Sequence, residues 1–304
     1  MKSRFLTAVL FSVASAAFAQ KVGVLNGPSG IPCAHLMEAA ENGKNAYSFE
    51  KFASAQNELP KLVKGEIDIG FLPPNAAAKV YNSASGAVVC LGIAGNGNLF
   101  LMTKDENIKS VADLSGKTIS CAGQGATPEY MMKYLMKKNS VEAELDFSTP
   151  NAEIAAALIQ GKFDYALVPE PFATVAQTKD SSVLRALNIS DEFKKIEKDD
   201  FPMTLLVANA KYAKKHKKEI RRFIEDYKAS SKWTVENPDE SGKLVEKHSL
   251  GLKAPVAAKA IPSAAYTWKS AKDGKAEIEK LLNIFLENSP QSVGNKLPDG
   301  KFYY

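Results

Sequence analysis

The chain is poor in the residues that catalytic and metal sites commonly use. Its 304 residues include three cysteines and three histidines, and no spacing of His, Cys and carboxylates matches a zinc site. It has no Walker loop, no G-x-S-x-G elbow and no dinucleotide fingerprint, since Gly123-Gln-Gly125 lacks a third glycine at the required distance. We therefore expect no catalytic residues, no metal ligands, no cofactor and no enzyme activity.

Cysteine is also too scarce for a disulfide scaffold. Cys33, Cys90 and Cys121 are an odd number of thiols, so at most one disulfide forms. Cys90 and Cys121 lie in β-type runs, which favours small buried side chains over a bridge. The sequence does not decide whether any two of the three pair.

Long hydrophobic runs are absent beyond the first residues. The chain opens with Lys2 and Arg4, an apolar stretch from Leu6 to Phe11, and Ala17-Phe18-Ala19. These are the three parts of a secretory signal peptide, and the apolar stretch is shorter than the roughly 20 residues that span a bilayer. We predict a signal peptide at residues 1–19, cleavage after Ala19, and a soluble protein in the periplasm.

Excess charge is small as well. The formal net charge is +5, and removing Lys2 and Arg4 lowers it to +3, which is too weak to indicate nucleic acid as a partner. A basic run between Lys211 and Arg222 is interpreted as a solvated helix face, with contact to acidic lipid or a partner left open. The length and the 45% of hydrophobic residues suit one large or two medium domains, and we expect a monomer.

The most informative feature is an internal repeat at an offset of 96 residues. Lys21–Gly27 falls on Lys117–Gly123, and Leu62–Pro73 falls on Leu158–Pro169 at the same offset. Because one offset relates both pairs of segments, we infer an ancient duplication of a domain-sized unit.

Each copy predicts the order strand, helix, strand, helix. A proline opens the first helix, over Pro32–Asn42 or Pro128–Lys138, and a glycine, Gly65 or Gly161, ends the helix before the buried strand. This alternation implies right-handed crossovers and a mostly parallel sheet flanked by helices in each copy. The predicted fold class is α/β, with two lobes.

Apolar β runs indicate where the chain passes between the lobes. Ala87–Ile93 and Leu99–Thr103 flank a turn where the chain would leave lobe 1, and Phe201–Val207 would carry it back. We predict that residues 20–97 and 205–304 form lobe 1, the second part mainly helical, and that residues 98–204 form lobe 2.

The predicted ligand site consists of four loops of the repeated units and the turn between the copies. The four loops are Asn26–Gly30, Pro73–Asn75, Ala122–Thr127 and Pro169–Phe172. In open parallel sheets, ligands lie beyond the carboxyl ends of the strands, where helix N-termini present unpaired N–H groups. Small residues let backbone approach a ligand, and polar side chains fix its orientation. The predicted ligand-binding residues are Asn26, Pro28, Ser29, Gly30, Pro73, Asn75, Asn96, Asn98, Gln124, Gly125, Ala126, Thr127, Glu170 and Phe172.

Two of these residues have an equal alternative role. Asn75 and Thr127 each stand at a predicted helix start, so each side chain is also a candidate helix cap. A cap whose N–H groups face the cleft would serve both purposes.

Glu170 is the most distinctive position in the four loops. It replaces Pro74 of the first copy and stands at a predicted helix start, where the helix dipole favours a carboxylate. In the cleft it would repel a simple anion and favour an amine, a hydroxyl or a protonated ring. None of the four loops contains Arg or Lys to balance it. We therefore expect a ligand other than nitrate or sulfonate, and an effect of Glu170→Gln on affinity rather than on thermal stability.

Several segments resemble a known family. Ile108–Ile119 contains a "DL-x-GK" segment that resembles the start of the second lobe in periplasmic solute-binding proteins of the nitrate, sulfonate and taurine class. Gly123–Tyr130, Val168–Phe172 and Lys296–Tyr304 look like a less characterised branch of that class. The resemblance spans the mature chain and implies a type II periplasmic binding protein, with the ligand cleft between the lobes.

The resemblance also implies a role in transport. Such proteins serve ABC importers: the lobes close around a small polar molecule by a hinge, here near Gly95–Leu99 and Phe201–Thr204, and the closed form docks on an inner-membrane permease. The class includes binders of thiamine-pyrimidine precursors. An amino-heterocycle of that kind is the favoured ligand, and a sulfonate- or nitrate-type anion is the alternative.

An enzyme on the same fold is the rival hypothesis. The pyrimidine synthase related to these binders carries a cysteine-rich iron site, which has no counterpart in this sequence. The menaquinone-pathway enzymes of this fold are cytosolic, whereas this chain carries a predicted signal peptide. A ligand-binding partner of a chemoreceptor stays open, because its binding physics is the same.

Overall fold

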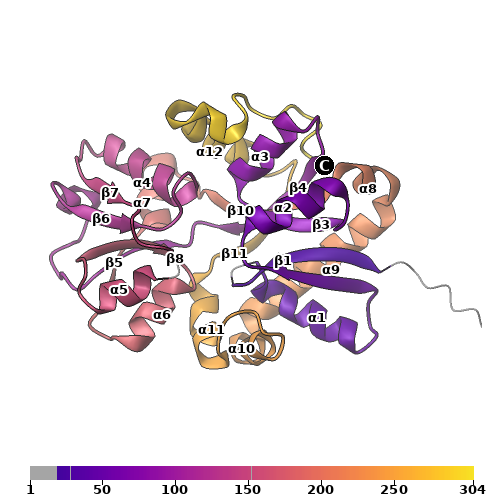
Figure 1. Cartoon of the computed structure of the whole chain (residues 1–304), viewed down its shortest axis with the longest axis horizontal. Coiled ribbons are helices and arrows are strands. Elements are labelled where there is room, and N and C mark those ends of the chain that lie inside the picture. Colours follow the sequence, from indigo (N-terminus) through magenta and orange to yellow (C-terminus); the bar gives the residue numbers. More distant parts are fainter. Residues whose placement is uncertain (1–18, 28, 152) are drawn as a thin grey trace, which may run out of the picture.

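The computed structural model describes residues 19–27, 29–151 and 153–304, which form two α/β lobes joined side by side (Figure 1). Residues 1–18 of the predicted signal peptide, and Pro28, lie outside the described residues. No helix in the described part of the chain is long and apolar enough to cross a membrane.

The described residues contain eleven strands in two sheets. They are β1 (Gln20–Leu25), β2 (Tyr47–Phe52), β3 (Ile69–Leu72), β4 (Val88–Asn96), β5 (Leu99–Thr103), β6 (Thr118–Cys121), β7 (Glu144–Asp146), β8 (Tyr165–Pro169), β9 (Leu184–Asn188), β10 (Pro202–Asn209) and β11 (Tyr266–Ser270). The sheet of lobe 1 has the strand order β11-β4-β10-β3-β1-β2, and that of lobe 2 has the order β7-β6-β8-β5-β9.

Helices cover both faces of the two sheets (Figure 1). They are α1 (Ala34–Glu41), α2 (Ala55–Lys64), α3 (Pro74–Ser83), α4 (Thr127–Lys138), α5 (Ile154–Ile159), α6 (Phe172–Lys179), α7 (Ile189–Glu197), α8 (Ala210–Lys215), α9 (Lys217–Glu236), α10 (Pro238–Lys247), α11 (Ala254–Ala260) and α12 (Lys275–Asn288). Short 3-10 turns lie at Ile31–Cys33, Val111–Leu114, Ile261–Ser263 and Pro290–Val293.

The two repeated units share one topology, which confirms the internal repeat. The order β2-β1-β3 in lobe 1 corresponds to β7-β6-β8 in lobe 2. In each unit the first strand lies in the middle and pairs in parallel with both others. The glycine expected to end the helix before β3 does so, since Gly65 is the C-cap of α2 with φ of 75°.

Two strands cross between the lobes and insert into the opposite sheet. β5 lies between β8 and β9, and β10 lies between β3 and β4, each antiparallel to both neighbours. Each crossing strand enters at the end where the parallel strands finish, as the pairing of Leu99 with Pro169 shows. The sheets are therefore mixed, and only the strands of the repeated units pair in parallel. The residue limits predicted for the lobes stay a prediction.

One apolar cluster runs through both lobes by way of α12. This helix packs on α3 of lobe 1 and on α4 of lobe 2. The rings of Tyr130 on α4 and Phe285 on α12 lie 4.6 Å apart, and both side chains belong to the same buried cluster. The C-terminal segment thus joins the lobes on one side by ordinary hydrophobic packing.

The structure differs from the sequence prediction in the second half of the chain. The part predicted to be mainly helical begins, after β10, with two separate helices, α8 and α9, because His216 leaves the helical region with ψ of 49°. The His216 ring stacks on Tyr212. Strand β11 interrupts the same mainly helical part and pairs antiparallel with β4. Its side chains are mostly half-buried, so the segment has no clear two-residue alternation.

The three cysteines are free and buried, as expected for small hydrophobic side chains. Burial raises the pKa of Cys90 and of Cys121 to about 12, and raises that of Cys33 further. All three are therefore protonated thiols at neutral pH, unsuited to act as nucleophiles.

Glu58 on α2 is a buried carboxyl group that fills a gap between β1 and β3. These strands pair only at Val22 and Ile69, and the N–H of Phe71 donates to Glu58 Oε1 at 2.9 Å instead of to a strand. Glycine makes the space, since a Cβ at Gly70 would lie 2.1 Å from that oxygen. Burial raises the pKa of Glu58 to about 8.

We predict that Glu58→Gln stabilises the protein at pH 7.5 by about 1–3 kcal/mol. Between its ordinary pKa of 4.5 and about 8, the unfolded state releases the proton that the folded state keeps. Wild-type stability therefore falls as the pH rises through this window, and glutamine removes that loss. Urea unfolding at a series of pH values measures the difference, which should vanish near pH 4. Parallel curves for both proteins would contradict the assignment.

Candidate ligand site between the lobes

A small cavity lies at the junction of the lobes, beside the ends of β4 and β10. Its volume is about 10 Å³, which is room for about one water molecule. It brings together three of the predicted ligand-binding residues with residues from distant parts of the chain. The cavity is lined by Ser29, Ala94, Gly95, Asn96, Asn98, Thr204, Tyr227, Ala264 and Tyr266.

Strand pairing explains why these residues meet. Tyr266 of β11 pairs with Gly95 of β4, and the N–H of Asn96 donates to the carbonyl of Ala265 at 3.0 Å. The C-terminal part of the chain therefore reaches the point where β4 leaves lobe 1. Ser29 arrives from the loop after β1, where its hydroxyl accepts the N–H of Leu25 at 3.0 Å.

Buried polar atoms without a partner are concentrated at this junction. Within the described residues, Asn96 Oδ1, Asn98 Oδ1 and the Tyr266 hydroxyl are buried and make no hydrogen bond. Burial, and secondarily the nearby Glu170 carboxylate, raise the pKa of Tyr266 well above its usual value. The hydroxyl therefore stays protonated and offers a donor, while the amide oxygens offer acceptors.

A second polar contact joins the lobes directly. Asn75 Nδ2 of lobe 1 donates to the carbonyl of Gly125 of lobe 2 at 3.1 Å. The Asn75 Oδ1 and Thr127 Oγ1 atoms are buried without a partner in the described part of the chain. Neither side chain caps its helix: Pro73 and Ala126 occupy the N-cap positions, and no side-chain cap hydrogen bond forms. The capping alternative is therefore wrong for both residues.

Glu170 is buried and balanced by a basic residue. Its side chain is 1% exposed, and Oε1 lies 2.6 Å from Arg185 Nη2. The N–H and hydroxyl of Thr174 each donate to the carboxylate at 3.1 Å. Burial raises the pKa of Glu170, and Arg185 opposes that shift. The expectation of an unbalanced carboxylate is wrong, because its basic partner comes from β9 and from none of the four loops.

Glu170 nevertheless lies next to the cavity. Its backbone N–H donates to the carbonyl of Asn98 at 2.9 Å, and its carboxylate acts on the Tyr266 hydroxyl across the junction. The guanidinium of Arg185 also donates through Nη2 to Thr174 at 2.6 Å and through Nε to Gln177 at 2.9 Å. The pair is therefore part of a hydrogen-bonded network beside the site.

Other predicted residues lie outside this cavity. Asn26, Gln124 and Gly125 are exposed, Pro73 and Ala126 are half-buried, and Gly30 is buried with no room for a side chain, since a Cβ would lie 2.7 Å from the carbonyl of Leu25. Phe172 packs against the apolar cluster of lobe 2. Their binding role stays a prediction.

Sequence reasoning missed Thr204, Tyr227, Tyr266 and Arg185. Tyr227 lies on α9, and its hydroxyl donates to the carbonyl of Ala94 at 3.4 Å. Tyr266 and Arg185 lie on short strands with mostly half-buried side chains. The one available signal was the cluster of aromatic residues Tyr266 and Trp268 in an otherwise helical region.

Solved structures define the class of protein. An ABC transporter structure from Parabacteroides distasonis has a TM-score of 0.81 at 25% identity, covering 94% of this chain and 99% of that chain. The periplasmic aliphatic sulphonate binding protein SsuA from Escherichia coli has a TM-score of 0.74 at 20% identity, covering 91% and 90%. The periplasmic nitrate-binding protein NrtA from Synechocystis PCC 6803 has a TM-score of 0.66 at 14% identity, covering 90% and 84%. The chain has the two-lobed fold of the substrate-binding proteins of ABC importers.

The family follows from the sequence. The model of the family described as NMT1/THI5 like matches residues 51–241, and the chain belongs to this family. No curated protein matches the sequence. The fold is shared with an enzyme, since the desulfurization enzyme DSZB has a TM-score of 0.65 at 12% identity, covering 92% of this chain and 94% of that chain.

We predict that Glu170→Gln lowers the free energy of unfolding by about 1–3 kcal/mol, because it leaves the partly buried Arg185 without its counter-charge. This reverses the sequence-based expectation that stability would change little. Urea unfolding measures the loss. The control is Glu225→Gln, which removes a 70% exposed partner of Lys228 and should change stability by less than about 0.5 kcal/mol. Equal effects of the two changes would refute the buried pair.

Proposed function

We propose that this protein is the extracytoplasmic substrate-binding protein of an ABC importer. It captures a small polar molecule between its lobes and delivers it to a permease in the inner membrane. One observation carries the proposal: buried amide oxygens and a tyrosine hydroxyl that find no partner among the described residues gather where the lobes meet. Each such group costs about 1–3 kcal/mol, and a ligand that pairs with them recovers this free energy.

Ligand entry requires the lobes to separate. The cavity of about 10 Å³ is far smaller than a heterocycle, and Asn75 already contacts Gly125 across the junction. The hinge is proposed at the crossing segments near Gly95–Leu99 and Phe201–Thr204, which connect β4 to β5 and lead into β10. A ligand that touches both lobes only when they approach favours the closed state by that difference in contacts.

An amino-substituted heterocycle, such as a thiamine pyrimidine precursor, is the proposed ligand. Amide oxygens of Asn96 and Asn98 accept hydrogen bonds from ligand N–H groups, and the Tyr266 hydroxyl donates to a ring nitrogen or a carbonyl. Tyr227 adds an aromatic surface. The Glu170–Arg185 pair is internally neutral, so the charges on this side of the junction favour neither an anion nor a cation.

An anionic ligand is the second candidate, since the sulphonate binding protein SsuA and the nitrate-binding protein NrtA share this fold. The observation in its favour is Arg185, a guanidinium that reaches the junction from β9. Against it, Glu170, Thr174 and Gln177 already engage that guanidinium. An anion would have to compete with a buried carboxylate.

A binding protein also fits the chemistry of the site better than an enzyme does. The cysteines are protonated at neutral pH because burial raises their pKa. Asn, Tyr and Thr side chains around the cavity bind and orient, and the carboxylate closest to them is held in an ion pair. The proposed setting is the periplasm, reached through the signal peptide predicted at residues 1–19, and the proposed state is a monomer.

The most direct test is native mass spectrometry of protein purified from the periplasm, with release and identification of the bound molecule. The expected result is a monomer of the mass of residues 20–304 carrying one small uncharged amino-heterocycle that is released unchanged. A bound sulfonate or nitrate would establish the second candidate. Covalent conversion of the molecule by the protein would refute the binding-only role.

We further predict that Tyr266→Phe weakens binding of that molecule about tenfold, which corresponds to one hydrogen bond of about 1.4 kcal/mol. Thermal stability should change little, because the hydroxyl makes no hydrogen bond within the described residues. Isothermal titration measures the affinity. The matched control is Tyr165→Phe, at the end of β8 that is remote from Glu170. The Tyr165 hydroxyl donates to Asp105 at 2.9 Å, and its loss should leave affinity unchanged. Equal affinities of wild type and Tyr266→Phe would remove this residue from the site.

A further inference from the structure

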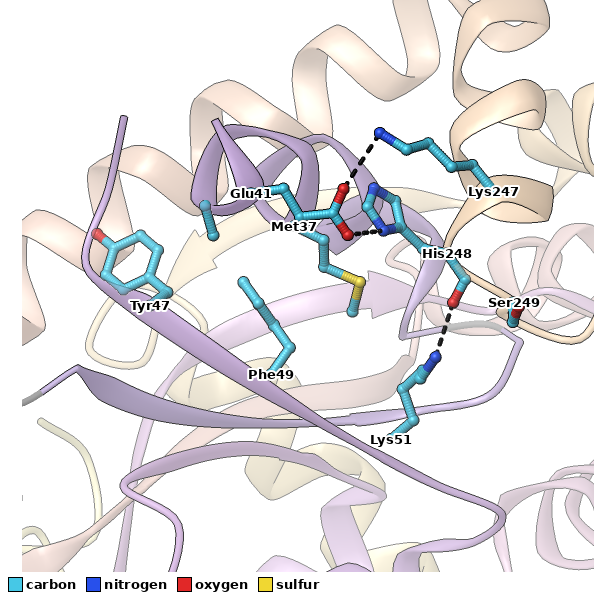
Figure 2. Close-up of a pocket in the computed structure, with 9 residues that line it drawn as sticks. Met37, Glu41, Tyr47, Phe49, Lys51, Lys247, His248 and Ser249 are labelled. Carbon is cyan, nitrogen blue, oxygen red and sulfur yellow. Dashed lines mark hydrogen bonds and ion pairs between the residues drawn. The ribbon is translucent and has the colours of Figure 1, made fainter. Parts of the chain in front are cut away.

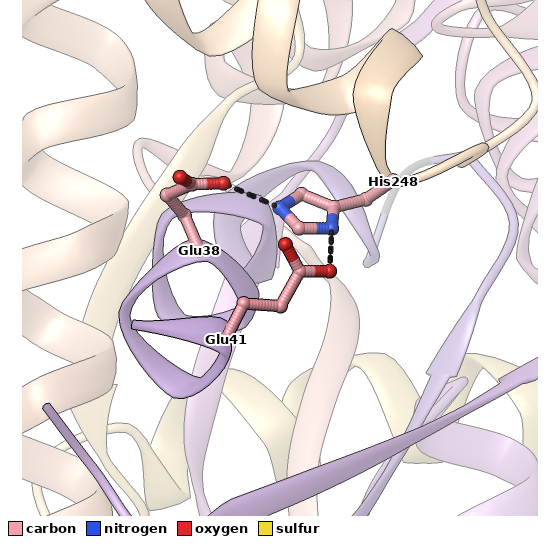
Figure 3. A group of neighbouring side chains, drawn as sticks. All are labelled: Glu38, Glu41 and His248. Atoms are coloured by element: carbon pink, nitrogen blue, oxygen red, sulfur yellow. Dashed lines mark ion pairs between the residues drawn. The ribbon is translucent and has the colours of Figure 1, made fainter. Parts of the chain in front are cut away.

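A second polar cluster lies on lobe 1, between α1 and the end of α10. It consists of Glu38, Glu41 and His248 (Figure 3). His248 Nε2 lies 3.2 Å from Glu38 Oε2, and His248 Nδ1 lies 3.4 Å from Glu41 Oε1. Each of the three residues has a potential metal-ligand atom that lies within 4.8 Å of those of the other two.

The fold holds the imidazole in place. Glu38 and Glu41 are three residues apart on α1 and therefore share one face of the helix. His248 is the C-cap of α10 and is 7% exposed. Lys51 of β2 donates to the backbone carbonyl of His248 at 2.9 Å. Three separate elements thus fix the ring against the two carboxylates.

The His248 ring presents a nitrogen that lacks a hydrogen bond. Nε2 is buried and has no hydrogen-bond partner among the described residues, although it points toward Glu38 (Figure 3). A buried polar atom in this state is costly. A cation could be coordinated by this nitrogen and by the carboxylate oxygen beside it.

We propose that His248 Nε2 and Glu38 bind one divalent transition-metal ion of the zinc class, with Glu41, whose carboxylate faces His248 Nδ1 in this structure, turning toward Nε2 as the third ligand. Imidazole and carboxylate together favour such ions over magnesium or calcium, which take oxygen ligands. Zinc bonds of about 2.0–2.1 Å in a tetrahedral site place two ligand atoms about 3.3 Å apart. The separation of 3.2 Å between His248 Nε2 and Glu38 Oε2 matches that edge.

Lys247 is the internal competitor for this site. Its ammonium contacts Glu38 and lies 3.1 Å from Glu41 Oε2. The side chain is 49% exposed, so the lysine can turn toward water, whereas the buried imidazole stays in place. A divalent ion replaces this single charge and gains the His248 nitrogen in addition.

An open pocket gives access to the cluster. It has a volume of about 450 Å³ and is lined by residues that include Met37, Phe49, Glu41, Lys51 and His248 (Figure 2). Figure 2 shows the Glu41 carboxylate at its wall, turned toward Lys247 and His248. A metal here would keep a solvent-facing position for water and would tie α1 to the end of α10, apart from the cavity at the lobe junction.

Titration of ZnCl₂ into untagged, chelator-treated protein tests the proposal by calorimetry. We expect one ion per chain, a rise in Tm with zinc, and no competition from MgCl₂. His248→Gln and Glu41→Gln should each weaken binding about a hundredfold, by analogy with the loss of ligand support in other metal sites. Glu41 is 57% exposed, so its variant tests the site even where the His248 variant fails to fold.

Lys247→Met separates the metal site from a purely structural ion cluster. We expect it to tighten zinc binding, since it removes the competing ammonium, whereas loss of a structural counter-ion alone would only lower Tm. The matched control is His216→Gln, which removes an exposed histidine between α8 and α9. It should leave zinc binding unchanged. The proposal fails if zinc does not bind, if the His248 and Glu41 variants bind it like wild type, or if Lys247→Met does not tighten binding.

Discussion

The exchange of two strands is the constraint on which this structure depends. β5 is paired on both sides in lobe 2, and β10 is paired on both sides in lobe 1, so each sheet is completed by a strand that has just crossed from the other lobe. The sheet of lobe 1 is built from two separate stretches of chain, β1–β4 and β10–β11, whereas β5–β9 of lobe 2 follow one another in sequence. The crossing segments must therefore run through the junction, where the carboxyl ends of the parallel strands also finish. The proposed ligand site and the proposed hinge coincide because both lie on these crossing segments.

The junction combines two kinds of contact with opposite demands. On one side α12 packs on α3 and α4, and the Tyr130–Phe285 contact buries apolar surface that favours association of the lobes. On the other side lie the buried amide oxygens of Asn96 and Asn98 and the hydroxyl of Tyr266, which have no partner in the described part of the chain. Apolar packing holds the lobes near each other, while the unpaired groups make full closure costly without a ligand. This balance is what a hinged binding protein requires.

Much of the fold was predictable because the signals of the repeat, such as the glycine that ends a helix, lie within short segments of sequence. Gly65 ends α2 through its own conformation, and the matched segments at one offset imply the same unit twice. The candidate site was predictable only in part. Ser29 belongs to a loop whose place follows from the parallel strands, and Asn98 belongs to the turn where the chain leaves lobe 1, but Tyr266 reaches them only through the pairing of β11 with β4. That pairing joins residues far apart in sequence and leaves no local pattern.

The ion pair of Glu170 and Arg185 shows why charge cannot be assessed loop by loop. Glu170 stands in a loop without Arg or Lys, yet burial forces any ionised carboxylate to find a counter-charge wherever the fold supplies one. Arg185 supplies the counter-charge from β9. The opposite charges of Glu170 and Arg185 balance each other, and Thr174 hydrogen-bonds to both groups. What remains toward the cavity is uncharged. In the proposed site, selectivity would come from the pattern of donors and acceptors and from shape. This supports the proposal of a neutral ring with amino groups over an anion that would have to break a buried pair.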